Sequence, residues 1–516
     1  MHPAASTSVN PVALRPEERR TVRAIALSAV TVLTMAASFN YVINHIVADL
    51  DATSTQTDTL RQVPSIAALL VVFLAGVLGQ RFGERRAMLF STVIFSVGAL
   101  VATVAPVIQL VTLGFLLTSI GQAVMIVVAL AYVSEVISDK DARASAFATF
   151  SSVEPVAYLV MPLLAGVLLS VAGWRWVAAS WVVFGLLGTF AVWRLIPARR
   201  RPPEAGPSEM LTPALAGVVL ASFVQLLTLL PKEGIAPATV AYLLALGLAI
   251  IALTVAMRRM SAPSLSFDPL RRGGLVLLLV VSILTLFANL GFYMTLSLQY
   301  VYGMSPLQVA VAFIPVNLAA IAGARLAGVG IQHWGLTATG AAAVALTGLS
   351  LGASALIGLG WPLWALLTIV GVYYAGAIGA MVALTNAVMD LVPDHEAGLA
   401  SSYRSAASHV GSAIGVAGMT AIVTAAVMAS IQAQASAAHI DATTYKEVAK
   451  STLGGASSEN VASTYAVPLD EVQQIDNIQR IAFLDGLHAQ GGVGMVVSFA
   501  AAGLFVVARR RALRPA

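Results

Sequence analysis

Long apolar blocks divide the chain, and they constrain its fold more than any other feature. Each block reaches about 20 residues or more, the length that an α-helix needs to cross a hydrocarbon core of about 30 Å. Only 10% of the 516 residues are charged, whereas about 25% are charged in a soluble domain. We therefore predict an all-α polytopic membrane protein. Its fourteen transmembrane helices are expected near 24–46, 62–80, 87–106, 109–134, 146–171, 175–195, 210–230, 237–257, 274–298, 306–331, 336–357, 362–389, 400–428 and 487–508.

The basic residues are unevenly divided between the two sides of the membrane that these spans define. An even number of spans places both termini on one side, and 22 of the 29 Lys and Arg residues fall on that side. Because the cytoplasmic segments of membrane proteins carry an excess of Lys and Arg, both termini are expected in the cytoplasm, with the protein in the cell membrane. Residues 1–23 contain no apolar stretch or cleavage pattern, so we interpret them as a retained cytoplasmic tail.

Two internal repeats organise the spans. The segment "GVLGQRFG" (76–83) recurs as "GVGIQHWG" (328–335), and "EVISDKDA" (135–142) recurs as "DLVPDHEA" (390–397). The offsets are 252 and 255 residues, and each pair follows equivalent spans. Two repeats at nearly the same offset predict two pseudo-symmetric halves of six helices. Halves of this kind form secondary transporters, in which the substrate site lies near the middle of the membrane between them.

The repeats also predict the domain boundaries. The N-terminal half is expected over 24–197 and the C-terminal half over 273–516, with a linker and two inserted transmembrane helices over 198–272. A long polar segment, 430–486, is expected outside the cell as part of the C-terminal half. It is long enough to cap the transporter or to bind a periplasmic adaptor protein, and the sequence leaves that choice open.

One carboxylate lies deep inside a predicted span. Glu154 is followed by Pro155 within the apolar stretch "FATFSSVEPVAYLVMPLLAGVLL" (147–169). A span that starts near residue 146 places Glu154 about 13 Å deep, where a charge costs roughly 2.5–3.5 kcal/mol and usually faces a cavity or a partner. Pro155 removes a backbone donor and favours a kink. Glu154 is therefore the first candidate for carrying a proton; the alternative is a neutral side chain that only packs.

Other polar residues inside spans are weaker candidates. His409 titrates near neutral pH in its unperturbed form, so it is the second candidate for proton handling, although a single helical His more often packs. Several further side chains either line a substrate cavity or bond to a neighbouring helix. These are Asn40, Tyr158, Asn289, Tyr293 and Asn317.

The composition gives little support to catalysis. The chain has no cysteine, so neither a disulfide nor a thiolate metal site is available. Its seven histidines form no H-E-x-x-H motif, and no Gly-Lys pair exists to form a phosphate-binding loop. We predict no enzyme activity, no cofactor, no metal and no nucleic-acid partner.

Several motifs resemble a known family. "GVLGQRFGERRAM" (76–88) resembles the loop signature of the major facilitator superfamily. "AGLASSYRSAASHVGSAIGVA" (397–417) and "AFLDGLHAQ" (482–490) resemble the last two helices of its fourteen-span drug:proton antiporters. "PLLAG" (162–166) followed by "GWRW" (173–176) is similar to the helix-five motif of that family. The resemblance implies a monomer that exports amphipathic small organic compounds in exchange for protons by alternating access.

The resemblance also assigns roles to individual residues. On helix five the motif residues are Pro155, Pro162 and Gly166. Charges corresponding to Arg81, Arg85 and Glu135 hold the cytoplasmic gate closed in the superfamily, although arginines there also anchor the chain to the membrane surface. The gate and motif candidates are Gly76, Gln80, Arg81, Gly83, Arg85, Glu135, Arg325, Asp390 and Arg404.

Three family charges are missing from this sequence. The loop Asp is replaced by Gln80, the acidic residue of helix one by Met35, and the Arg of helix four by Phe115. The usual Arg of the thirteenth helix aligns with Ser408, and Arg404 lies four residues earlier on roughly the same face. These departures favour an alternative, which is a carrier with altered or no proton coupling. A non-transport membrane protein on the same scaffold is a further alternative.

Overall fold

The computed structural model describes most of the chain. The described residues are 15–137, 139–197, 209–260, 263–271, 273–287, 290–300, 302–393, 396–438, 440–441, 445, 447–449, 458–465 and 467–512. Most of the predicted tail, the first part of the predicted linker and Asn289 lie outside these residues. Within them every regular element is a helix, so the all-α prediction is confirmed.

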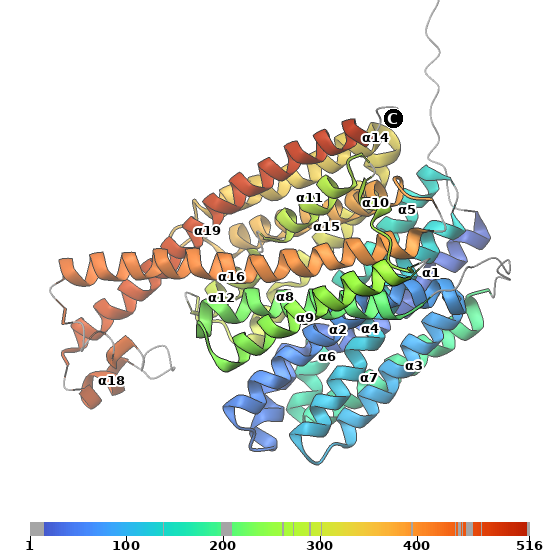
Figure 1. Cartoon of the computed structure of the whole chain (residues 1–516). Coiled ribbons are helices and arrows are strands. Elements are labelled where there is room, and N and C mark those ends of the chain that lie inside the picture. The colour runs from blue at the N-terminus through green and yellow to red at the C-terminus, as the bar shows by residue number, and fades with distance from the viewer. Residues whose placement is uncertain are drawn as a thin grey trace, which may run out of the picture.

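The helices follow the predicted order along the chain (Figure 1). The N-terminal group comprises α1 (Pro16–Asp49), α2 (Ser54–Phe82), α3 (Glu84–Val104), α4 (Ile108–Val136), α5 (Lys140–Ser151), α6 (Val153–Val171) and α7 (Trp174–Leu195). The inserted pair is α8 (Leu211–Glu233) and α9 (Pro237–Arg259). The C-terminal group comprises α10 (Asp268–Arg271), α11 (Leu275–Phe287), α12 (Leu290–Tyr300), α13 (Pro306–Ala312), α14 (Ile314–Ser354), α15 (Leu363–Met389), α16 (Ala397–Ala437), α18 (Ser458–Tyr465) and α19 (Leu469–Ala512).

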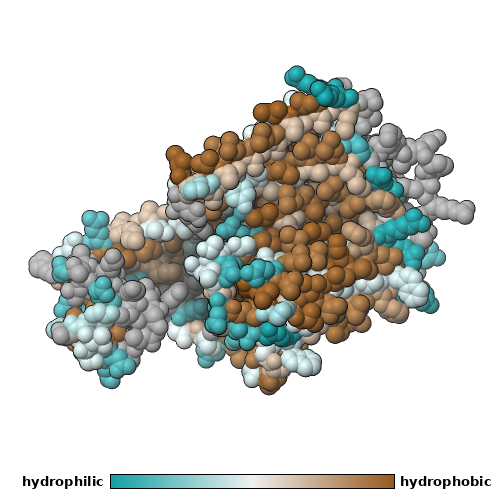
Figure 2. Space-filling view, turned by 60° about the horizontal axis from the view of Figure 1, so that its bottom comes forward, coloured by the Kyte–Doolittle hydropathy of each residue, from teal (hydrophilic) through white to brown (hydrophobic). Residues whose placement is uncertain are grey.

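Twelve helices of the described chain are long and apolar enough to cross a membrane. One of these segments, Leu307–Ser354, covers two expected spans and contains a non-helical residue, Gly335, with φ 81°. Another expected span is divided between α11 and α12, which are too short to be counted alone. Figure 2 shows the resulting apolar belt, with hydrophilic residues on either side of it. The number of fourteen spans stays a prediction, whereas a multi-pass helical membrane protein is established.

Two long helical segments are interrupted just before a proline. The segment that carries Glu154 is interrupted at Ser152, between α5 and α6, and the next segment of this kind at Phe313, between α13 and α14. Pro155 lacks the N–H group that would bond back into α5, which explains the interruption where the sequence predicts a kink. At the second interruption, the Asn317 amide donates to the Phe313 carbonyl at 3.0 Å. Interrupted helices of this kind often line the substrate path of transporters.

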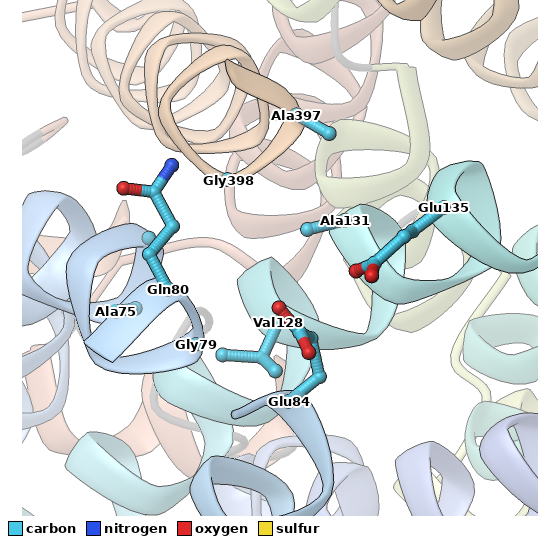
Figure 3. A pocket seen from close by; sticks show the side chains of 10 residues that line it. Ala75, Gly79, Gln80, Glu84, Val128, Ala131, Glu135, Ala397 and Gly398 are labelled. Carbon is cyan, nitrogen blue, oxygen red and sulfur yellow. The ribbon is translucent and has the colours of Figure 1, made fainter. Parts of the chain in front are cut away.

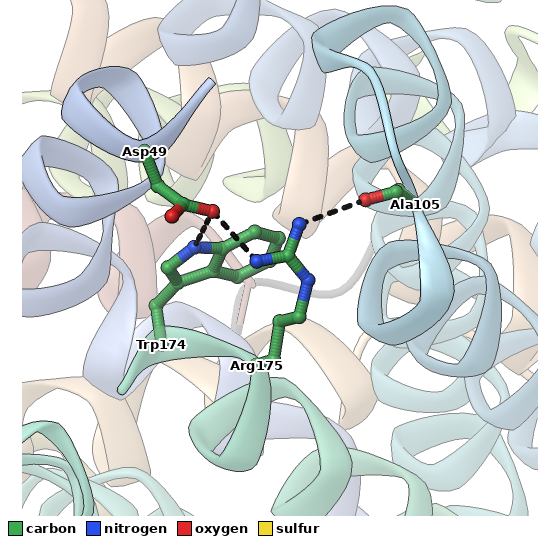
Figure 4. Close-up of polar contacts among 4 residues, drawn as sticks. All are labelled: Asp49, Ala105, Trp174 and Arg175. Carbon is green, nitrogen blue, oxygen red and sulfur yellow. Dashed lines mark hydrogen bonds and ion pairs between the residues drawn. The ribbon is translucent and has the colours of Figure 1, made fainter. Parts of the chain in front are cut away.

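The two ends of the bundle are defined by their loops. We call the end that carries Gly83 and Arg509 the inner end, and the end that carries Asp49 and Gly173 the outer end. At the outer end, the Asp49 carboxylate accepts hydrogen bonds from Trp174 Nε1 at 3.0 Å and from Arg175 at 2.6 Å. The Arg175 guanidinium also donates to the Ala105 carbonyl (Figure 4). These bonds join the outer ends of α1, α3 and α7 into one unit.

The inserted pair contacts both groups of helices. Helix α8 packs against α9, and it also lies against α2 of the first group and α16 of the second (Figure 1). The Gln225 amide donates to the Gln62 side chain at 2.9 Å, and Gly217 lies so close to α2 that a Cβ there would collide with the Leu70 carbonyl. The pair therefore packs along the junction between α2 and α16.

The polar segment 430–486, expected as an external loop, is partly helical, because α16 and α19 extend into it. Helices α16 and α19 have 41 and 44 residues, or about 60 Å each, so both extend well beyond the membrane. Above the outer end they are joined by a hydrogen bond of 2.5 Å from Ser430 to Asp485. A small apolar cluster includes Val448, Val461 and Ile475. The Ala-rich sequence explains the helical extension, because Ala has the highest helix propensity.

Candidate functional site

The two groups of helices pack tightly at the inner end. Gly76 of α2 lies so close to α16 that a Cβ there would fall 2.6 Å from the Gly398 carbonyl oxygen. On α16, Ser401 donates to the Val127 carbonyl at 2.9 Å and Ser402 to the Val72 carbonyl at 2.8 Å. Small residues and hydroxyl groups allow such close approach between helices. The inner end of the junction between α2, α4 and α16 is therefore closed.

A small pocket with acidic side chains lies at this junction (Figure 3). Gln80 and Glu135, both predicted gate residues, line it together with Gly398 at the start of α16. Glu84 lines the same pocket, and its side chain is only 8% exposed. Glu84 was not among the residues predicted from the sequence; it is the first residue of α3, and the turn at Gly83 brings it beside Gln80 at the end of α2.

The gate role predicted for Arg81, Arg85 and Glu135 stays a prediction. In this structure Arg85 donates to the Trp193 carbonyl at the end of α7, at 2.5 Å. The reason is that Arg85 lies on the side of α3 that faces α7. The guanidinium of Arg81 lies 5.4 Å from the ring centroid of Phe82, and its pairing with Glu135 stays a prediction. Gly83 has a φ of 84°, which explains the need for glycine in this turn.

The C-terminal group has its own ion pair at the inner end. Asp390, at the end of α15, lies 3.6 Å from a guanidinium nitrogen of Arg509 on α19, and both side chains are largely buried. Asp390, which corresponds to Glu135 in the second repeat, therefore forms its ion pair within the C-terminal group of helices. Arg325 on α14 is exposed, which leaves a gate role for it as a prediction.

Glu154 faces the opposite group of helices. Its carboxylate interacts electrostatically with Arg404 on α16, and also with Tyr158 one turn further along α6 and Tyr374 on α15. The side chains of Glu154 and Tyr158 are nevertheless exposed. This face of α6 therefore lines an accessible space between the two groups. Glu154 lies about 21 Å along the helical segment from the start of α5 at Lys140, and its depth of about 13 Å in the membrane stays a prediction.

Arg404 forms the other charged part of this site. Its side chain is 5% exposed, and its Nε has no hydrogen-bond partner among the described residues. It lies three residues, or about one turn, beyond Ser401, which bonds to α4 of the other group, so the two side chains share the face of α16 that meets that group. From the sequence, Arg404 was predicted as a gate residue, or as a replacement for the usual arginine that aligns with Ser408.

His409 and three of the cavity candidates lie elsewhere. His409 is partly buried, and no charged side chain of the described chain interacts with it, so the structure does not join it to Glu154. The Tyr293 hydroxyl bonds to Thr420 at 2.8 Å within the C-terminal group, and Asn317 bonds to its own helix. Asn40 is exposed on α1. Of the predicted cavity residues that the structure describes, Tyr158 shares a face of its helix with Glu154.

The remaining motif residues of helix five belong to α6. Pro155 and Pro162 are buried. Gly166 faces α13, because a Cβ on Gly166 would lie 3.2 Å from the Leu307 side chain. The outer half of α6 therefore packs against the C-terminal group with a small residue at the contact.

Met35 and Phe115, which replace two family charges, lie in an apolar contact. Both side chains are 1% exposed. The ring of Phe115 lies 5.6 Å from that of Phe39 and 5.8 Å from that of Trp181, measured between centroids. The Trp181 indole donates to the Ser38 hydroxyl at 2.9 Å. We call this contact between α1, α4 and α7 the aromatic contact. None of the residues named in it is charged.

Two groups of membrane helices that enclose a charged, accessible interface define a transporter of the alternating-access class. The chain belongs to the Major Facilitator Superfamily, whose family model matches residues 25–416. Transporters of this family bind small organic substrates within the membrane.

Similar proteins include the methyl viologen resistance protein SmvA of Salmonella typhimurium, which is 25% identical over 71% of this chain and 75% of its own length. The lincomycin resistance protein of Streptomyces lincolnensis is 27% identical over 67% of this chain and 72% of its own length. The fold is similar to that of the human organic anion transporter MFSD10 (TETRAN), with a TM-score of 0.63 and 14% identity over 95% of this chain and all of that chain.

Proposed function

We propose that the protein exports amphipathic small organic compounds across the cell membrane in exchange for protons, and that Glu154 carries the proton. The observation that supports this proposal is an accessible carboxylate between the two groups of helices, facing a buried cation on the opposite group. A proton and the cationic part of a substrate compete for such a carboxylate, and this competition is the basis of exchange.

The conformation favours a transporter that opens to the outside in this state. The inner end is closed by the contact of Gly76 with Gly398, whereas Glu154 remains accessible. In the proposed orientation the inner end is cytoplasmic, because the basic residues are concentrated there. Resistance to organic compounds in the names of the relatives is consistent with export as the direction of transport.

The test is Glu154→Gln, which preserves the shape of the side chain but removes titration. Purified protein is placed in liposomes, and uptake of the fluorescent cation rhodamine 123 is measured with and without a pH gradient. We expect the wild type to accumulate the dye when only a proton gradient is supplied, whereas Glu154→Gln loses this accumulation but still exchanges dye at equal pH. Asp476→Asn, in the outer extension of α19, is the matched control and is expected to behave as the wild type.

Accumulation of dye by Glu154→Gln under a proton gradient alone would contradict the proposed role. A second candidate function, facilitated transport without proton coupling, is favoured by the apolar surroundings of Met35 and Phe115. In that case the wild type would equilibrate the dye at every pH gradient without accumulating it.

A further inference from the structure

Arg404 differs from the other buried arginines of the described chain. Arg143 donates to the Ile137 carbonyl at 2.8 Å, and Arg509 is paired with Asp390. Arg404 is as buried as these two, but within the described residues it has neither a hydrogen bond nor an ion pair within 4.0 Å. A guanidinium has five N–H donors, and a buried charge without a direct partner is strongly unfavourable. Arg404 therefore has a buried donor that no anion of the described chain satisfies.

Glu154 does not supply that anion directly. The two side chains interact across the interface, but they are further apart than an ion pair. The interface between them thus presents a cation on α16 and an accessible carboxylate on α6. Tyr158 and Tyr374 interact with the same carboxylate, so aromatic surfaces accompany the two charges. A ligand with both charges and an aromatic body matches this arrangement.

We propose that Arg404 binds the anionic group of the substrate and that the transported compounds are zwitterionic amphipaths, whose cationic group lies opposite Glu154. This inference rests on the proposed function and adds the class of substrate to it. Arginine stays protonated at all physiological pH values. Arg404 therefore holds the anionic group at any pH, while Glu154 exchanges the cationic group of the substrate for a proton.

The experiment compares two dyes that differ in one group. Rhodamine 110 has a free carboxylate and is zwitterionic, and rhodamine 123 is its methyl ester. Binding of each to the purified protein in nanodiscs is measured by fluorescence polarisation at neutral pH, without a gradient. We expect the wild type to bind the acid about tenfold more tightly than the ester, as a charge-assisted bond to a guanidinium allows.

Three variants test whether Arg404 is responsible. Arg404→Gln should remove the preference for the acid while retaining affinity for the ester, which also shows that the binding site is folded. Arg404→Lys should retain part of the preference, because it preserves the charge but not the fork of donors. Arg271→Gln removes an exposed arginine of the same group, on α10, and should leave the preference unchanged.

Equal affinity of the wild type for the two dyes, or failure to bind the acid, would overturn the inference. So would a preference for the acid that survives in Arg404→Gln. Because binding is measured without a gradient, these outcomes are independent of proton coupling. A failure of proton-driven accumulation would contradict the proposed function and leave the preference for the acid standing.

Discussion

The aromatic contact and the face of α6 that carries Glu154 differ in character. In the aromatic contact, Met35, Phe115 and Trp181 are at most 1% exposed and enclose a single hydrogen bond between polar side chains. On the α6 face, Glu154 and Tyr158 are exposed and face Arg404 across the interface. The family resemblance places functional charges at the positions of Met35 and Phe115. In this chain both positions hold apolar side chains that pack in the aromatic contact.

This difference indicates that the aromatic contact and the α6 face have separate roles. The aromatic contact stabilises the N-terminal group as a rigid unit, together with the outer bonds of Asp49 to Trp174 and Arg175. The α6 face carries the titratable and ligand-binding groups. Substitutions in the first region should therefore change stability, and those in the second should change transport.

The largest effect on stability is expected from Met35→Asp. This change restores an acidic side chain to the family position, but the site is buried and offers no cation, so we expect a loss of about 3–5 kcal/mol, as for an uncompensated buried charge. Thermal unfolding in detergent measures the loss. Asn44→Asp, at an exposed position of the same helix beside Arg61, is the control and should unfold like the wild type. A stable Met35→Asp protein with increased proton-driven transport would contradict this prediction. It would show that residue 35 is accessible to water rather than enclosed in the aromatic contact.

A smaller loss is expected from Trp181→Phe. The change removes the indole N–H that donates to Ser38 and leaves a small void beside Phe115, which together cost about 1–3 kcal/mol. The ratio of proton-driven to gradient-free transport should not change. Trp176→Phe, at a 61% exposed position of the same helix, is the matched control. Altered coupling in Trp181→Phe, at unchanged stability, would be the opposite of what the structure predicts.

The smallest change in stability is expected from Tyr158→Phe. The phenol is 41% exposed and forms no hydrogen bond within the described residues, so unfolding should shift by less than about 0.5 kcal/mol. Any functional effect should appear as altered affinity for the dyes, because the hydroxyl faces the same space as Glu154. A marked loss of thermal stability would indicate instead that this face of α6 is packed.

Much of the fold could be predicted from local patterns, and the site only in part. The apolar blocks and the kink near Pro155 both depend on neighbours in the chain, and in the described residues the structure has helices in these blocks and an interruption at Ser152. The partner of Arg85 could not be predicted, because it depends on the rotation of α3 about its axis. For the same reason the sequence did not indicate that Glu84 enters the inner pocket.

By itself, the sequence determined that the protein is a helical membrane transporter, because the length of an apolar block is a property of a continuous stretch of chain; the spacing of its motifs predicts two repeated halves. Only the tertiary structure decided which charges face one another. Glu154 and Arg404 are 250 positions apart and belong to different groups of helices. Their approach depends on how the two groups of helices pack against each other. The role of a charged side chain inside a membrane therefore depends on the groups that face it.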